Sequence, residues 1–311
     1  MTDSSFRTAA HFPGGRMTPG DWSTLAGVAA RHGGEVVLTP RGGIRVRRAG
    51  GDTVPRDRLV AEGLPRRIGD HRLPRILASP MAGRIDGHHD LADLPERLDA
   101  ELAARLGDAG PAGATDPAPS GARLLLGLDA GAGDILAHAP DLAAVAGGAG
   151  DALRVHAAGR DTAVGIGAAD AAAVLADVTA ELARRLDDRP GVPDSGDLHD
   201  LVVVILDGHP LTVAVGSPAP LTTPAEIPRV GWIDSADGLV SLLAVVADGV
   251  VPARLAEFLG AVDRPSTVSP DRVIGLHGLT EGMAEQVVRV LAPMGMIFDA
   301  TSPWADPTRS A

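Results

Sequence analysis

The clearest alternation of apolar and polar positions along the chain lies at residues 44–47, Ile-Arg-Val-Arg. It follows an apolar, β-branched run at residues 35–39 and a turn-like Pro-Arg-Gly-Gly. We predict a strand, a tight turn and a second strand, in which the two apolar residues face a core and Arg45 and Arg47 face away from it. With Arg41 in the turn, three guanidinium groups share one surface. That surface suits either the binding of a polyanion or the solvated outer face of an antiparallel sheet.

The residues before and after this hairpin predict further elements of a small α+β unit. Residues 18–31 begin with Thr-Pro-Gly-Asp, which supplies a helix N-cap, a proline at the first helical position and an acid in the first turn. Apolar residues then recur at helical spacing. A first strand is predicted at residues 6–12 and a short helix at residues 56–62. Strand, helix, strand, strand, helix is close to the order of a split β-α-β, ferredoxin-like unit.

The middle of the chain reads as a mixture of helices, strands and linkers. Helices are predicted at residues 93–106 and 168–186. Strands are predicted at residues 124–128 and 135–139, joined as a hairpin, at 153–157 and 162–166, and as a buried strand at 201–206. Residues 72–83 are predicted to have little regular structure, residues 110–121 and 217–229 have linker composition, and residues 189–198 resemble a domain boundary.

Residues 230–311 repeat the opening of the chain. Strands are predicted at residues 239–247, 266–269 and 274–277, and helices at residues 252–261 and 280–293. Residues 38–47 align with residues 268–277, and residues 15–19 with residues 248–252. In this alignment Gly275 and His277 replace Arg45 and Arg47, so the arginines belong to the first copy alone. A duplication of this kind predicts two similar units that pack as a pseudo-symmetric pair.

Charge and composition narrow the classes of function. The net charge of −12 argues against general nucleic-acid binding. Residues 31–84 nevertheless hold twelve arginines against five acidic residues, which favours a local anionic ligand. The absence of cysteine excludes disulfides, thiolate catalysis and a cysteine-ligated zinc ion or iron–sulfur cluster. The N-terminus has no signal-peptide pattern and the longest apolar run is too short to span a bilayer, so we expect a cytoplasmic protein without a membrane partner.

Histidines and acidic residues offer two weaker candidates. His88 and His89, with His71 nearby, have no third ligand at helical spacing, so no metal site is predicted. Asp129 and Asp134 flank a glycine-rich turn and are expected to bind its backbone. The glycines between them do not match a dinucleotide fingerprint, because strand residues rather than a helix follow.

Ser79, Ser217 and His209 carry side chains that occur in catalytic sites. Neither Ser79 nor Ser217 lies in a nucleophile elbow. A catalytic His209 is conceivable, but the sequence identifies no partner for it. No catalytic residue is therefore predicted.

Several motifs together resemble a known family. Residues 13–19 (Pro-Gly-Gly-Arg-Met-Thr-Pro), followed by a helix and residues 38–42 (Leu-Thr-Pro-Arg-Gly), resemble the ferredoxin-like half-domain of nitrite and sulfite reductases. Residues 76–83 (Ile-Leu-Ala-Ser-Pro-Met-Ala-Gly) and 126–134 (Leu-Gly-Leu-Asp-Ala-Gly-Ala-Gly-Asp) resemble the precorrin-3B synthase branch, which belongs to cobalamin biosynthesis. The motifs Gly-Trp, Asp-Gly and a closing Met-Gly-Met-Ile resemble its second half-domain, so the resemblance runs from about residue 10 to residue 299.

The resemblance implies an α+β fold with duplicated ferredoxin-like half-domains, a middle α/β sandwich domain and pseudo-two-fold symmetry. A tetrapyrrole would lie in the cleft between the half-domains. The implied divisions are a first half-domain at 1–70, a tetrapyrrole-domain-like region at 71–190, a strand and linker at 191–225, a second half-domain at 226–300 and a disordered tail at 301–311.

The resemblance also implies site residues and cofactors. Arg41, Arg45, Arg47 and Arg75 would contact the carboxylates of an anionic tetrapyrrole. Arg41 and Arg47 stand where the family keeps arginines, Arg45 stands where it often has an amide, and Arg75 is shifted by one residue from the family's arginine. The arginine that the family places before its Leu-Pro-Gly-Gly is replaced by His11. The family uses a 4Fe-4S cluster and, in the reductases, sirohaem, but no cluster is expected in a chain without cysteine.

Two functions from different classes follow. One is a precorrin-3B synthase-like or nitrite/sulfite reductase-like oxidoreductase-family protein of cobalamin biosynthesis, degenerate or truncated, working with a separate cluster-bearing chain. The other is a non-catalytic protein that binds an anionic tetrapyrrole without a redox centre.

Overall fold

The computed structural model describes residues 9–64, 73–85, 89–91, 93–107, 123–147, 152–188, 194–216, 230–235 and 237–305. The chain forms two compact units. Unit 1 consists of residues 1–70, 84–86 and 226–311, and unit 2 of residues 71–83 and 87–225. Both combine helices with sheets, so the predicted α+β fold class is confirmed. In the described part of the chain, no helix is both long and apolar enough to cross a lipid bilayer.

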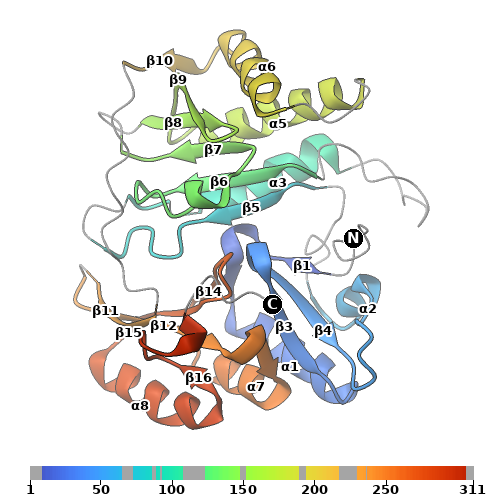
Figure 1. Ribbon diagram of the computed structural model, residues 1–311, viewed down its shortest axis with the longest axis vertical. Coiled ribbons are helices and arrows are strands. Elements are labelled where there is room, and N and C mark those ends of the chain that lie inside the picture. The colour runs from blue at the N-terminus through green and yellow to red at the C-terminus, as the bar shows by residue number, and fades with distance from the viewer. Residues whose placement is uncertain are drawn as a thin grey trace. The chain divides into compact units, whose positions relative to one another are not determined.

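Unit 1 contains two antiparallel sheets (Figure 1). The first has the order β1-β4-β3-β13, with β1 at Ala10–His11, β4 at Gly43–Arg47, β3 at Glu35–Thr39 and β13 at Val250–Pro252. The second has the order β11-β12-β15-β14-β2, with β11 at Gly231–Asp234, β12 at Val240–Val246, β15 at Ile274–Leu279, β14 at Ser266–Val268 and β2 at Arg16–Met17. A short strand, β16 (Met296–Ile297), also pairs with β12.

The two sheets exchange strands between the two sequence copies. In the first copy, β1 lies in the first sheet, and the chain then turns through η2 (Pro13–Gly15) and enters the second sheet as β2. In the second copy, β12 lies in the second sheet, and the chain turns through η5 (Ala247–Gly249) and enters the first sheet as β13. Each copy therefore completes the sheet of the other, which is the arrangement that a pseudo-two-fold axis generates.

The two crossing turns are built alike and need glycine at the same place. Gly15 has φ +69 and Gly249 has φ +69, which is left-handed backbone. A Cβ on Gly15 would lie 2.1 Å from the carbonyl oxygen of Val268, and one on Gly249 would lie 2.9 Å from that of Leu38. A side chain at either position would collide with the hairpin of the other copy.

The structure corrects the predicted register of these segments by one residue. Arg16 pairs with Thr267, and Val250 pairs with Val37. Since Val37 and Thr267 are equivalent in the hairpin alignment, Arg16 corresponds to Val250 and not to residue 249. The sequence alignment was wrong here because it matched Pro19 with Pro252, whereas the strand pairing matches Gly15 with Gly249.

Helices cover one face of the two sheets. They are α1 (Pro19–Arg31), α2 (Arg56–Ala61), α7 (Ala253–Ala261) and α8 (Glu281–Leu291). The predicted cap of α1 is confirmed: the Thr18 hydroxyl accepts the Asp21 N–H at 3.2 Å, and an Asp21 carboxylate oxygen accepts the Thr18 N–H at 2.8 Å. Trp22 of α1 is fully buried, and its indole N–H donates to the hydroxyl of Ser266 on β14 at 2.8 Å. The core between helices and sheets thus ties the first copy to the second.

Unit 2 has one six-stranded sheet with the order β10-β9-β8-β7-β6-β5. The strands are β10 (Thr212–Ala214), β9 (Arg160–Gly167), β8 (Ala152–Ala157), β7 (Leu142–Val145), β6 (Leu125–Asp129) and β5 (Arg75–Ala78). β5, β6 and β7 are parallel to one another, and the remaining pairs are antiparallel. Helices α3 (Leu94–Leu106), α5 (Ala171–Asp187) and α6 (Ser195–Asp207) pack on the same face of this sheet (Figure 1).

Several sequence predictions in unit 2 are wrong. Residues 201–206, predicted as a buried strand, lie in α6. Residues 135–139, predicted as a strand, contain the 3-10 helix η4 (Leu136–His138), and β6 pairs in parallel with β7 in place of the expected hairpin. The connection predicted at residues 72–83 contains β5. The linkers predicted at residues 110–121 and 217–229 lie outside the described residues.

Two predictions at the ends of the chain are also changed. Of the strand predicted at residues 6–12, the structure describes only β1, and residues 1–8 lie outside the description. Within the tail predicted to be disordered, Pro303–Ala305 forms the 3-10 helix η7 and Ala305 is buried. Residues 306–311 are not among the described residues.

Candidate functional site

The hairpin of β3 and β4 carries three of the four arginines predicted to bind a ligand. Leu38 pairs with Ile44 and Thr39 with Gly43, which leaves a three-residue loop at residues 40–42. The apolar residues of β4 are buried in the core of unit 1, whereas Arg45 and Arg47 lie half-buried on the opposite face, called here the outer face. The predicted alternation of this strand is therefore confirmed.

Arg47 has a partner that the sequence analysis missed. Glu35 pairs with Arg47 across the two strands. The Arg47 Nε donates to Glu35 Oε1 at 2.9 Å, and a second guanidinium nitrogen binds the same oxygen. Glu35 thus neutralises one of the three positive charges predicted for this hairpin, that of Arg47. The signal was present in the sequence, because a three-residue loop places Glu35 opposite Arg47.

Arg45 occupies the middle of the outer face. It pairs in register with Val37, and burial lowers the pKa of its guanidinium from the ordinary value. An arginine remains charged at neutral pH even so. The hairpin therefore holds a positive charge that has lost part of its hydration, which is the state in which a carboxylate binds most strongly.

Arg41 lies at the tip of the loop and is exposed. Its backbone has φ +68 and ψ +31, a left-handed conformation that costs an arginine roughly 1–2 kcal/mol. Its N–H donates to the carbonyl oxygen of Pro270 at 3.0 Å, so the hairpin loop of the second copy touches that of the first. Non-glycine residues in this conformation persist where their surroundings hold them there.

Arg75, the fourth predicted residue, belongs to unit 2. It is the first residue of β5, pairs with Leu125 of β6 and is half-buried. The structure thus places Arg41, Arg45 and Arg47 on one hairpin of unit 1, and Arg75 on a strand of the other unit. Binding of a ligand by any of the four stays a prediction.

The two equivalent positions of the second copy hold neutral, buried residues. Gly275 and His277 on β15 occupy the positions of Arg45 and Arg47, as the sequence alignment predicted. His277 is 1% exposed, and Ser241 and Thr267 beside it are also buried. The imidazole Nε2 lies 2.8 Å from the Thr267 hydroxyl, and Nδ1 lies 3.0 Å from the Ser241 hydroxyl.

Burial keeps this histidine uncharged. It lowers the pKa of His277 well below the usual range, and the positive charges of Arg84 and Arg16 lower it further. A neutral imidazole donates through one nitrogen and accepts through the other, and hydroxyl groups satisfy either choice. Gly275 makes the arrangement possible, because a Cβ there would lie 2.6 Å from both the His277 Nε2 and the Thr267 hydroxyl. The signal for this cluster was one polar side chain in each of two otherwise apolar strands, Ser241 in β12 and His277 in β15.

In unit 2, a glycine-rich loop follows the carboxyl end of β6. Asp129 is fully buried, and its carboxylate accepts the backbone N–H groups of Gly131, Gly133, Ile135 and Leu136 at 2.9–3.2 Å. The expectation that this aspartate binds its own turn is confirmed. The N–H groups that could cradle a phosphate are already occupied by a carboxylate of the chain.

Asp134, at the end of the same loop, forms a longer-range contact. The Ser79 hydroxyl donates to Asp134 Oδ1 at 2.6 Å and accepts the Ala130 N–H at 3.0 Å, so it bridges the ends of β5 and β6. Burial and the neighbouring Asp129 raise the pKa of Asp134 to about 6. Ser79, which lies in no nucleophile elbow, thus has a structural role at the ends of these two strands.

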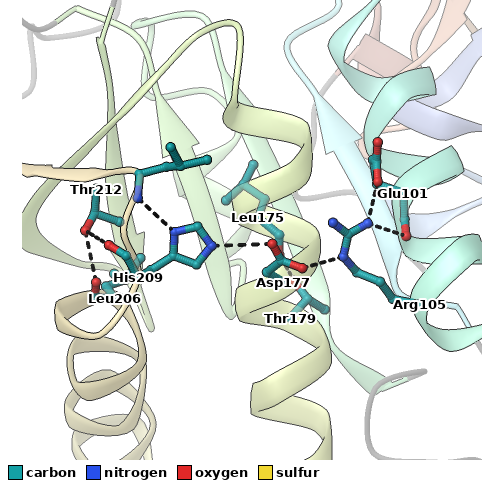
Figure 2. A network of polar contacts seen from close by, with 9 residues as sticks. Glu101, Arg105, Leu175, Asp177, Thr179, Leu206, His209 and Thr212 are labelled. Carbon is teal, nitrogen blue, oxygen red and sulfur yellow. Dashed lines mark hydrogen bonds and ion pairs between the residues drawn. The ribbon is translucent and has the colours of Figure 1, made fainter.

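His209 also has a partner that the sequence did not identify. Its Nδ1 accepts the Leu211 N–H at 3.3 Å, and its Nε2 lies 3.4 Å from Asp177 of α5 (Figure 2). Asp177 in turn accepts from the Arg105 Nε of α3 at 2.6 Å. Figure 2 shows this chain of contacts linking α3, α5 and the segment that follows α6. We interpret it as a structural link between helices.

Metal binding finds no support among the described residues. Within that part of the chain, no three histidine, aspartate or glutamate side chains are grouped so that they could hold a metal ion. His71 and His88, which the sequence analysis considered, lie outside the described residues. A thiolate-ligated iron–sulfur cluster does not fit the 311 residues either, because they include no cysteine.

Part of the chain matches a known family model, and its fold is similar to that of a solved structure. Residues 8–56 match the family model of the nitrite/sulfite reductase ferredoxin-like half domain, a range that includes the whole β3–β4 hairpin. No curated protein sequence matches the chain.

Among solved structures, the chain resembles the NirA protein of Mycobacterium tuberculosis, with a TM-score of 0.67 and 14% sequence identity. The match covers 94% of this chain and 57% of the other, so the chain spans little more than half the length of that protein. At this identity the likeness concerns the fold.

Proposed function

We propose that the β3–β4 hairpin of unit 1 binds the carboxylates of an anionic tetrapyrrole. The observation that carries the proposal is the charge on its outer face: Arg41 is exposed at the tip, and Arg45 is a partly desolvated cation on the strand. The same segment matches the half-domain family model, and the fold of the second copy needs no arginine at the equivalent positions. Guanidinium groups suit carboxylates because they offer two parallel donors.

Arg47 would join the site by exchanging its partner. In the free protein it is bound to Glu35, so a ligand carboxylate has to compete with that residue. A polycarboxylate tetrapyrrole offers several anions at once, which matches a set of arginines better than a single small oxyanion does.

We further propose a precorrin-3B synthase-like, nitrite/sulfite reductase-like function for the protein, in cobalamin biosynthesis and in the cytoplasm. The motifs at residues 76–83 and 126–134 support this branch of the family. Redox chemistry would need electrons from a separate cluster-bearing chain, because these 311 residues offer no thiolate ligand. The second candidate is a tetrapyrrole-binding protein without redox turnover, and the lack of cysteine favours it.

A titration with sirohaem, followed by its absorption spectrum, tests the binding proposal. Wild-type protein is expected to shift the spectrum, and Arg45→Ala is expected to raise Kd at least about tenfold, equivalent to about 1.4 kcal/mol. Arg289→Ala, an arginine of α8 in the second copy, is the matched control and should bind as the wild type does. No binding by the wild type, or equal binding by Arg45→Ala, contradicts the proposal.

Glu35→Gln gives an independent test of the role of Arg47. Removing the carboxylate charge releases the Arg47 guanidinium from its ion pair, so the affinity for sirohaem should increase. A decrease would mean that Glu35 orients Arg47 or contacts the ligand itself.

To separate the two candidate functions, sirohaem-loaded protein is supplied with reduced methyl viologen and nitrite. Nitrite consumption favours the reductase-like function, whereas binding without consumption shows that the loaded chain does not reduce nitrite by itself.

A further inference from the structure

The loops of the two hairpins are equivalent in sequence but differ in backbone conformation. Gly42 in the first copy and Arg272 in the second occupy the same position, and both are left-handed, with φ +70 and φ +64. The preceding position differs: Arg41 is left-handed, whereas its counterpart Asp271 is not among the residues with positive φ. The additional left-handed residue is thus the exposed arginine of the proposed site.

The second loop makes the contact that accompanies this conformation. The Arg41 N–H donates to the Pro270 carbonyl oxygen at 3.0 Å. Beside it, Gly42 lies in van der Waals range of the second copy: a Cβ there would be 3.4 Å from the Val268 carbonyl oxygen and 3.9 Å from the Pro270 nitrogen. The two loops are therefore packed backbone to backbone within unit 1.

The loop of the second copy is itself held rigid by one side chain. Ser269 is buried, and its hydroxyl accepts the N–H groups of Asp271 and Val273, each at 3.2 Å. Its backbone closes the same loop, since the Ser269 N–H donates to Val273 at 2.9 Å and its carbonyl oxygen accepts from Arg272 at 3.0 Å. These bonds fix the direction of the Pro270 carbonyl that receives the Arg41 N–H.

We infer that the second copy, which has no arginine at the positions of Arg45 and Arg47, serves as the template that holds Arg41 in its binding conformation, with Ser269 as the positioning residue. The backbone conformation at Arg41 sets the direction of its Cα–Cβ bond, and so the region that its guanidinium reaches. Ser269 acts through Pro270 and touches no ligand. This inference rests on the proposed function, because it concerns the conformation in which Arg41 binds.

The test compares three variants by two measurements. Hydrogen–deuterium exchange at the Arg41 amide reports its bond to Pro270 without any ligand, and titration with sirohaem reports binding. Ser269→Ala removes the acceptor of two N–H groups. It is expected to speed exchange at Arg41 and to raise Kd for sirohaem about fivefold to tenfold.

Two matched variants separate positioning from general stability. Ser269→Thr keeps the hydroxyl, and Thr is the residue that the first copy has at this position, Thr39, so exchange and affinity should return to wild-type values. Thr280→Ala removes a hydroxyl that accepts one N–H, that of Met283, at the start of α8 in the same unit, and should leave both readings unchanged. If Ser269→Ala fails to fold, Gly42→Ala disturbs the same contact from the other side and should have the same two effects.

Each result decides the inference. Unchanged exchange at Arg41 in Ser269→Ala would show that the second loop does not hold Arg41. Faster exchange with unchanged affinity would show that the conformation of Arg41 is irrelevant to binding, which also overturns the inference. Failure of the wild type to bind sirohaem refutes the proposed function and the binding role of Arg41. Even then the exchange data still report whether the second loop holds its backbone.

Discussion

The carboxyl group of Asp134 gives the most quantitative prediction for unit 2. It is largely buried next to Asp129, and burial is the main reason that its pKa rises from 3.8 to about 6. We consider the substitution Asp134→Asn. An asparagine keeps the shape and an oxygen that accepts both the Ser79 hydroxyl and the Ile135 N–H, so the hydrogen bonds of Oδ1 are preserved while the charge is removed.

The expected gain in the free energy of unfolding follows from the shift in the pKa of Asp134. A folded-state pKa above the unfolded one means that the native state binds the proton more tightly than the unfolded state does. The stability linked to this proton is complete below the unfolded value of 3.8 and is lost as pH rises through about 6. A shift from 3.8 to about 6, at about 1.36 kcal/mol per pKa unit, corresponds to about 3 kcal/mol. Asp134→Asn should therefore stabilise the protein by up to about 3 kcal/mol at about pH 7.5 and by less than about 1 kcal/mol at about pH 4.

Urea unfolding at the two pH values measures this difference. All three tryptophans, Trp22, Trp232 and Trp304, lie in unit 1, so tryptophan fluorescence follows that unit alone. Circular dichroism follows both units, and the gain should appear in the dichroism transition that fluorescence does not follow. Asp200→Asn in unit 2, where the side chain is 81% exposed, is the control and should change little at either pH. An equal effect of Asp134→Asn at both pH values would refute the reasoning.

Three further predictions concern unit 1. Gly275→Ala should destabilise it by about 1–3 kcal/mol, measured by urea unfolding with tryptophan fluorescence, because the new Cβ would lie 2.6 Å from Thr267 Oγ1 and His277 Nε2; wild-type stability would contradict the account. His277, whose pKa is lowered by burial, stays neutral in the native state while the unfolded chain takes up a proton near its usual pKa, so stability should fall as pH drops below about 6.5. His277→Gln should reduce that slope, and an unchanged slope would be evidence against it. The Arg41→Gly variant should be more stable than the Arg41→Ala variant by about 1 kcal/mol, and should melt at a higher temperature, because glycine adopts φ +68 without strain. Equal melting temperatures of the two variants would exclude strain at this position.

The local patterns of unit 1 were sufficient to predict most of its elements. The strict alternation at residues 44–47 gave the faces of β4, and the Thr-Pro-Gly-Asp start gave the capped helix α1. The strand exchange between the copies was not predictable in the same way. It depends on two kinked turns with left-handed residues and on the close approach of each turn to the hairpin of the other copy. Such contacts join residues about 250 positions apart, as Gly15 and Val268 do, and leave no local periodicity.

The errors in unit 2 have two physical causes. The run at residues 201–206 is β-branched and apolar, but Leu198, Leu201, Val202 and Ile205 are all buried at helical spacing, and the Asp194 side chain caps the helix before them. The helical spacing of the buried residues and the N-cap at Asp194 were better evidence for the type of this element than its β-branched composition. Residues 135–139 have strand-like composition, yet the Asp129 carboxylate accepts the N–H groups of the N-cap Ile135 and of Leu136, the first residue of the 3-10 helix, and these bonds favour a turn.

The placement of the three hairpin arginines was predicted from the sequence, but their electrostatic surroundings were not. The sequence placed Arg41, Arg45 and Arg47 on one hairpin, as the structure does. It did not reveal that Glu35 balances Arg47, that burial perturbs Arg45, or that Arg41 is held by the second copy. Each of these depends on a cross-strand or long-range contact. Glu35 could have been found from the hairpin register, whereas the contact of Arg41 with Pro270 required the three-dimensional structure.

The central claim is that arginines of the β3–β4 hairpin bind the carboxylates of a tetrapyrrole, and its most direct test is the salt dependence of sirohaem binding. Guanidinium–carboxylate contacts weaken as salt screens them, so wild-type Kd should rise steeply between low and high ionic strength. A double variant, Arg41→Ala with Arg45→Ala, should bind weakly and lose most of that dependence. Wild-type affinity and an unchanged salt dependence in the double variant would contradict the account.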